Sequence, residues 1–128
     1  MDDHSIGATL NLINARVKAS FHLEADIQSF ANNRLTVMVG EDLTYSYDFQ
    51  VVFENVFTVS LNSSFRIDTQ LPWLSIIPAP ACIEVNVRFR VETGNTLFQL
   101  HNQDNLPFFV AAGSISYLPT GGKLWSYH

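Results

Sequence analysis

The residues of this sequence that could carry out chemistry begin with its paired carboxylates. Glu24 and Asp26 stand two positions apart in an alternating stretch, so an extended chain places both on one face. Asp48 and Glu54 share a face more loosely. Two carboxylates across neighbouring strands can serve as general acid and as base or nucleophile in glycoside hydrolysis. An exposed strand face gives the same pattern without catalysis, and we favour that interpretation.

Metal binding and nucleophilic catalysis have less support. The histidines are His4, His22, His101 and His128. No two of them have the spacing of metal ligands on one helix or strand. Cys82 has no neighbouring His or Lys in the sequence that would activate its thiol. We therefore expect neither a metal nor a cofactor.

The most suggestive side chains are apolar and lie outside the alternating pattern. Exposed aromatic residues can anchor a protein partner or offer a stacking surface to a sugar. We predict an interaction surface on Leu71–Ala81 and Leu124–Tyr127, with at least one tryptophan partly exposed. The alternative is that the first tryptophan closes one end of a barrel and the tail packs on a sheet. The candidate binding residues are Trp73, Leu74, Ile76, Trp125 and Tyr127.

The elements that must position these residues are mainly strands. From Leu43 to Leu61 nearly every odd position is apolar, and only Asn55 is out of step. A period of two indicates extended chain with one buried face. Nineteen residues exceed the usual strand length of about 3–10. We therefore predict two strands here, with a bend or bulge near Glu54-Asn55 that keeps the phase.

The remaining strands follow from the same alternation. Phe21, Leu23, Ala25 and Ile27 indicate a half-buried strand, and Asn32-Asn33 indicates a hairpin turn, since Asn tolerates positive φ. The other strands are expected at Leu35–Val39, Cys82–Glu92, Thr96–His101, Leu106–Ala112 and Ser114–Leu118, the last two separated at Gly113. Phe49, Val51 and Phe53 should meet Val85, Val87 and Phe89 in the core.

Two segments differ. Ile6, Leu10, Ile13 and Val17 recur at helical spacing, which predicts a short helix over about residues 5–15. That helix either binds a partner or, as we favour, covers the apolar face of the sheet. Residues 62–81 form an irregular apolar connection, because Pro72, Pro78 and Pro80 exclude a central strand.

Together these elements predict a single all-β domain over residues 1–128. It has about eight short, mostly antiparallel strands in a β-sandwich or partly closed barrel, followed by a tail at 119–128.

Charge narrows the range of partners. The formal net charge is −5, and the seven Lys and Arg residues are scattered. Only Arg88 and Arg90 share a strand face, and Glu84 and Glu92 share it too. Polyanion binding rests on clustered phosphate contacts, so we exclude nucleic acid and favour a basic protein partner.

Location is inferred from the sequence alone. The start, MDDHSIG, is acidic where a secretory signal would be basic, and no segment approaches the ~18 apolar residues of a membrane helix. A single cysteine excludes an intrachain disulfide. We expect a cytoplasmic protein with no membrane segment.

Three functions are compatible with these features. The favoured one is a non-catalytic interaction domain, such as a small acidic inhibitor or antitoxin-like protein, that binds a protein partner or itself. The second is a module for a small ligand or carbohydrate, and the third is a small enzyme with carboxylate chemistry. A deep pocket lined by Trp73 would favour the second, and a flat acidic face would favour the first.

Overall fold

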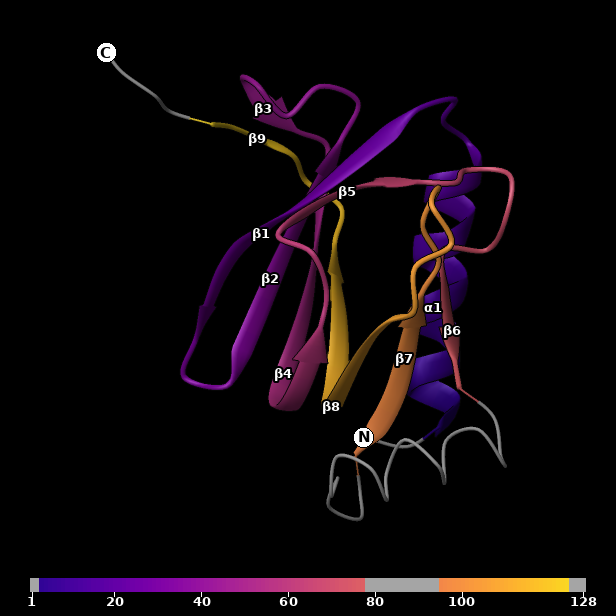
Figure 1. Cartoon of the computed structure of the whole chain (residues 1–128), viewed down its shortest axis with the longest axis vertical. Helices are drawn as coiled ribbons and strands as arrows, with labels where there is room; N and C mark the ends of the chain where they lie inside the picture. The colour runs from indigo at the N-terminus through magenta and orange to yellow at the C-terminus, as the bar shows by residue number, and fades with distance from the viewer. Residues whose placement is uncertain (1–2, 78–94, 125–128) are drawn as a thin grey trace.

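The computed structural model describes residues 3–77 and 95–124 and shows one curved sheet with a helix against it (Figure 1). Within these ranges the elements are α1 (Asp3–Lys18), β1 (Leu23–Ala31), β2 (Arg34–Gly40), β3 (Ser46–Tyr47), β4 (Phe49–Ser60), β5 (Ser64–Ile67), β6 (Leu74–Ile76), β7 (Thr96–Leu100), β8 (Phe108–Leu118) and β9 (Gly122–Lys123).

Seven strands form an antiparallel sheet in the order β5-β1-β2-β4-β8-β7-β6, and β3 and β9 form a separate two-stranded ribbon. The sheet bends into a half-barrel, so the mainly-β, antiparallel prediction is confirmed, and of its two forms the partly closed barrel is the one observed. The β5 edge curls toward the β7–β8 connection. There the Gln103 N–H donates to the Arg66 carbonyl at 3.0 Å, and the Phe65 and Phe108 rings meet at 5.1 Å.

Helix α1 fills the concave side of the half-barrel. Ile6, Leu10, Ile13 and Val17 are buried as predicted, in one cluster with the inward residues of the sheet. The helix extends beyond the expected 5–15 range at both ends, and its C-terminal extension carries the buried stripe on to Val17. Packing of an apolar face supplies most helix stability in proteins, which outweighs the cost of Gly7.

The core follows the predicted parity in β4 and β7. Phe49, Val51 and Phe53 are fully buried, and so are Phe98 and Leu100. The strand predicted at Cys82–Glu92, with Val85, Val87 and Phe89, lies outside the described residues.

The alternating stretch Leu43–Leu61 differs from its prediction in the number and length of its strands. It forms one twelve-residue strand, β4, while of the residues before Phe49 only Ser46–Tyr47 are in a strand, and Tyr45 is exposed. The irregularity near Glu54-Asn55 is confirmed, since Asn55 has a φ of 54°. A Cβ atom placed on Gly113 would lie only 3.1 Å from the Cβ of Asn55. The glycine of β8 therefore leaves room for this bend.

The bend moves Phe57 to the surface, which contradicts its predicted burial. After Asn55 the inward position passes to Val56, and Phe57 is 40% exposed. Between Val56 and Thr58 the register with β8 shifts by one residue, after which Val59 packs against the core again. Because the irregularity lies on β4, β8 continues through Gly113 as one strand where two were expected.

Further differences arise at β1 and in the Pro-containing connection. Phe21 is 99% exposed, because β1 begins only at Leu23.

Residues 62–77 contain the short strands β5 and β6, which form the two edges of the sheet. Edge positions agree with the exclusion of a central strand there, since a proline cannot donate to a ladder.

The β1–β2 hairpin turns at Asn32-Asn33 as predicted, with φ of 54° and 61°. We expect Asn33→Val to lower the free energy of unfolding by about 1–2 kcal/mol, because a β-branched residue resists positive φ. Asn33→Gly serves as the control and should be nearly neutral in urea denaturation. Equal losses for the two variants would contradict a role for backbone conformation here.

Candidate functional site

The predicted interaction residues separate into buried, exposed and undescribed ones. Trp73 and Leu74, two of the predicted binding residues, are fully buried and offer no exposed surface to a partner. Ile76 is 41% exposed. Trp125 and Tyr127 lie outside the described residues, so the predicted exposure of at least one tryptophan now depends on Trp125 and stays a prediction.

Trp73 is buried because the chain enters β6 at this point. The Trp73 carbonyl accepts the N–H of His101 at 2.7 Å, which joins it to the end of β7, and its side chain belongs to the core cluster. Its indole Nε1 has no hydrogen-bond partner among the described residues. Trp73 is therefore a core residue, which agrees with the alternative interpretation of the sequence.

The outer edge of β6 is joined to α1 by one side chain. The Asn14 amide nitrogen donates to the Leu74 carbonyl at 2.8 Å, and its oxygen accepts the Leu74 N–H at 2.9 Å. An amide side chain thus pairs with a strand edge as a neighbouring backbone would. Sixty residues separate the two partners, so no local pattern in the sequence indicates this contact.

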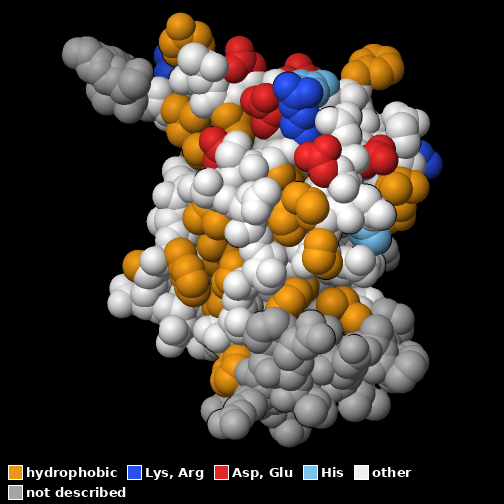
Figure 2. All heavy atoms as spheres, in the orientation of Figure 1, with side chains coloured by type: hydrophobic (Ala, Val, Ile, Leu, Met, Phe, Trp, Pro, Cys, Tyr) orange, Lys and Arg blue, Asp and Glu red, His pale blue; other side chains and the backbone are white. Residues whose placement is uncertain are grey.

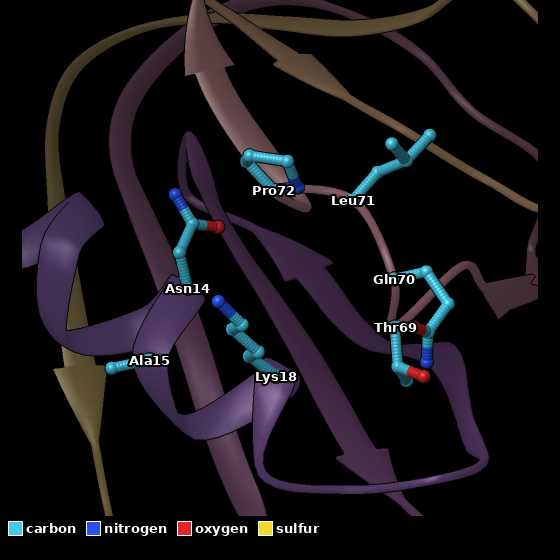
Figure 3. A pocket seen from close by; sticks show the side chains of 7 residues that line it. All are labelled: Asn14, Ala15, Lys18, Thr69, Gln70, Leu71 and Pro72. Carbon is cyan, nitrogen blue, oxygen red and sulfur yellow. The ribbon is translucent and has the colours of Figure 1, made fainter.

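A pocket of about 210 Å³ opens beside this contact (Figure 3). We call it the α1–β6 pocket, and its lining is Asn14, Ala15 and Lys18 from α1 and Thr69, Gln70, Leu71 and Pro72 from the β5–β6 connection. Leu71 is 53% exposed at this pocket. The first residues of the predicted interaction segment therefore do line a surface pocket, although Trp73 does not.

Hydrogen bonds hold the connection that lines this pocket. The Asp68 carboxylate accepts the N–H of Gln70 at 3.0 Å, and the Thr69 hydroxyl donates to the Phe21 carbonyl at 3.2 Å. The wall around Leu71 is thus held by hydrogen bonds between side chains and backbone groups. Lys18 is the one ionisable residue in the lining.

A second hollow, of about 350 Å³, lies over β5 and has a charged lining. It includes Glu24, Arg66 and Asp104, and Figure 2 shows acidic side chains around a basic one at this end of the molecule. His22 Nε2 lies 3.7 Å from the Glu24 carboxylate. Trp73 lines neither this hollow nor the α1–β6 pocket.

Two of the four carboxylates considered for catalysis form ion pairs with arginine. Glu24 and Asp26 do share one face of β1, opposite Arg66 and Ser64 of β5. Asp48 lies 3.6 Å from Arg16, and Glu54 lies 2.9 Å from Arg34.

No described residues combine into a group of three or more His, Cys, Asp or Glu side chains that could hold a metal ion. Within the same ranges, no helix is both long and apolar enough to cross a membrane.

Within residues 3–77 and 95–124, the carboxyl group of Asp42 has a shifted pKa. The Thr44 hydroxyl and backbone N–H, the latter at 3.0 Å, lower the pKa of Asp42 from 3.8 by hydrogen bonding to its charged form. A lowered pKa contributes stability above about pH 3.8 that is lost as the pH falls through the folded-state value. Asp42 is fully exposed and lies in the β2–β3 turn, so this effect is local.

Comparison of the chain with protein-family models, with curated proteins and with solved structures finds no significant match.

Proposed function

We propose that this protein is a non-catalytic protein-interaction domain whose α1–β6 pocket receives an apolar side chain of its partner. The observation that carries this proposal is the exposed Leu71 at a small pocket with a single cation, Lys18. Binding energy at protein interfaces is concentrated in a few side chains that fill well-packed, desolvated pockets, and a partner side chain seated here against Leu71 would be one of them.

The size of the pocket favours a side chain over a free ligand. Pockets for drug-sized molecules have volumes of about 300–1,000 Å³. At about 210 Å³ the α1–β6 pocket is smaller, yet a cavity of about 150 Å³ already accepts benzene. One Leu, Met or Phe side chain is therefore the best-fitting occupant.

The charge at the pocket favours an acidic group next to that side chain. Lys18 is exposed at the last residue of α1, and no salt bridge involves it among the described residues. A partner segment with Asp or Glu beside its apolar anchor would neutralise this ammonium group. The basic partner expected from net charge would instead use the acidic end around Glu24 and Asp104.

We also propose a role and a location for this domain. A small inhibitor or antitoxin-like protein is one form of such a domain, and composition alone supports it. A cytoplasmic location rests on the sequence alone.

A displayed library of random peptides tests the proposal. We expect selection on this protein to enrich peptides with an apolar residue next to Asp or Glu. Leu71→Asp should weaken their binding at least tenfold, which corresponds to about 1.4 kcal/mol. Lys18→Glu should shift the enriched peptides from acidic to basic.

Leu106→Asp is the matched control, since Leu106 is an exposed leucine on the β7–β8 connection and not in the pocket lining. It should leave peptide binding unchanged. No enrichment on the wild-type protein, or equal losses for the two variants, would overturn the proposal.

A further inference from the structure

The second half of β1 has an open edge. β5 pairs with β1 only as far as Asp26, and the Ile27 N–H then donates to the Ser63 carbonyl at 2.8 Å. Among the described strands, the remaining part of β1, Gln28–Ala31, pairs with β2 alone, and all of its residues are exposed. Figure 1 shows the end of the β1–β2 hairpin projecting past β5.

The backbone groups of Phe30 point outward on this open edge. Residues opposite each other in an antiparallel pair alternate between those that exchange both backbone hydrogen bonds and those that exchange none. Ile27, opposite Val37, exchanges none with β2, since its N–H is directed at Ser63. Two positions along β2, Leu35 is again a position of this kind, and Phe30 lies opposite it. The N–H and C=O of Phe30 thus face away from β2, where no described strand pairs with them.

A bulge turns the side chain of Phe30 to the inner face of the sheet. The register of β1 against β2 shifts between Ile27 and Ser29, so Phe30 shares a face with Leu35, which is fully buried in the core. Without the extra residue, Phe30 would lie on the outer face. Phe30 is nonetheless 54% exposed, and β5 does not extend far enough to cover its flank. The apolar inner face therefore reaches the open edge.

The two outermost strands of the sheet, unlike the end of β1, have contacts along their outer edges. At β6 the Asn14 amide pairs with the backbone of Leu74, and at β5 the Gln103 N–H donates to the Arg66 carbonyl. Charged residues and proline often protect an exposed edge from pairing with another chain. Gln28–Ala31 contains no Lys, Arg, Asp, Glu or Pro. This edge is therefore open to a further strand.

We propose that the open edge at Gln28–Ala31 binds an extended segment of a partner protein, which adds to the sheet in line with β5. One residue of the segment lies opposite Phe30 and exchanges both backbone hydrogen bonds with it, as antiparallel pairing allows. The side chain of that residue lies on the same face as Phe30, so Val, Ile or an aromatic residue fits best.

The segment needs no charge at this edge. Arg34, opposite Ala31 in the hairpin, already pairs with the Glu54 carboxylate at 2.9 Å. None of the residues that line the α1–β6 pocket belongs to β1 or β2. The open edge is thus a second site, and it does not depend on the pocket.

Hydrogen exchange measured by NMR tests the edge in the free protein. We expect the Phe30 amide to exchange rapidly, while the amide of Ser29, which faces β2, is protected. A protected Phe30 amide in the free protein would mean that the edge is already covered, and would overturn the proposal. This measurement needs no variant.

Peptide selection tests the binding. We would select a displayed library of random peptides on the Leu71→Asp variant, whose pocket anchor is removed, so that the result is independent of the proposed function. We expect uncharged peptides rich in Val, Ile or aromatic residues, and a bound peptide should protect the Phe30 amide from exchange. No enrichment, or enriched peptides that leave this amide unprotected, would overturn the proposal.

Phe30→Pro and Phe30→Ala separate the backbone from the side chain. Proline removes the outward N–H and no bond to β2, and prolines occur on edge strands where this N–H faces solvent. The affinity of Phe30→Pro for the selected peptides should be at least about tenfold below that of Phe30→Ala, which keeps the N–H. Phe57→Ala, at an exposed phenylalanine of β4, is the control and should leave the affinity unchanged. Equal affinities of the Pro and Ala variants would overturn pairing through the backbone of Phe30.

Discussion

Trp73→Ala is expected to lower the free energy of unfolding by about 3–5 kcal/mol. The side chain is the largest among the fully buried residues described, and its loss leaves a cavity between α1 and the sheet. A domain with a total stability of about 5–15 kcal/mol would lose a large part of it. Urea denaturation followed by far-UV circular dichroism measures the change directly.

Trp73→Phe is the matched control for this prediction. It keeps most of the buried ring and removes the indole N–H, which lacks a partner among the described residues. We therefore expect a smaller loss than for Ala. A change of only a few tenths of a kcal/mol for Trp73→Ala would mean that the indole is not core. In a Trp125→Phe background, acrylamide should quench the remaining fluorescence weakly until the protein unfolds.

Asn14→Asp is expected to cost about 1–3 kcal/mol at pH 7. The carboxylate still accepts the Leu74 N–H but cannot donate to the Leu74 carbonyl, which loses its partner and faces a negative charge. Asn11→Asp is the control, because it adds the same charge to an exposed position of the same helix. Equal losses for the two variants in urea denaturation would exclude the edge contact as the cause.

Acid should rescue the Asn14→Asp variant. Once protonated, the introduced carboxyl group has both a donor and an acceptor, as the native amide does. The folded state therefore favours the neutral form, and the pKa of this group rises above the unfolded value of about 3.9. The stabilising contribution is then fully present below that pH and is lost as the pH rises through the folded-state pKa. The gap in unfolding free energy between the variant and wild type should therefore narrow as the pH falls to about 3–4.

The sequence predicts the fold where a pattern is local. Phe49, Val51 and Phe53 alternate, and the buried stripe of α1 recurs at helical spacing, so their burial could be inferred without coordinates. Phe57 could not be placed, because two irregularities close together in β4 each reverse the parity and together restore it.

The candidate site was less predictable, since it depends on contacts between distant segments. Trp73 lies in a stretch without a period, and its place in the core is seen only in the packing, where it joins the buried cluster just before β6 pairs with β7. The Asn14–Leu74 contact and the α1–β6 pocket join α1 to a segment far along the chain. Leu71 was within the predicted interaction segment, but nothing in the sequence indicated which residues of α1 line the pocket opposite it.

The connection from β5 to β6 has a consequence for how the chain is made. These strands are consecutive in the sequence, yet they occupy opposite edges of the sheet, and the run between them crosses the open side of the half-barrel (Figure 1). β6 pairs with β7, and β4 pairs with β8, whose residues are synthesised later. During translation, β6 and one side of the long apolar strand β4 therefore have no partner strand until Thr96–Leu118 has left the ribosome. Such non-local pairing folds slowly, on a millisecond-to-second scale, and leaves the nascent chain dependent on its charges or on a chaperone against premature association.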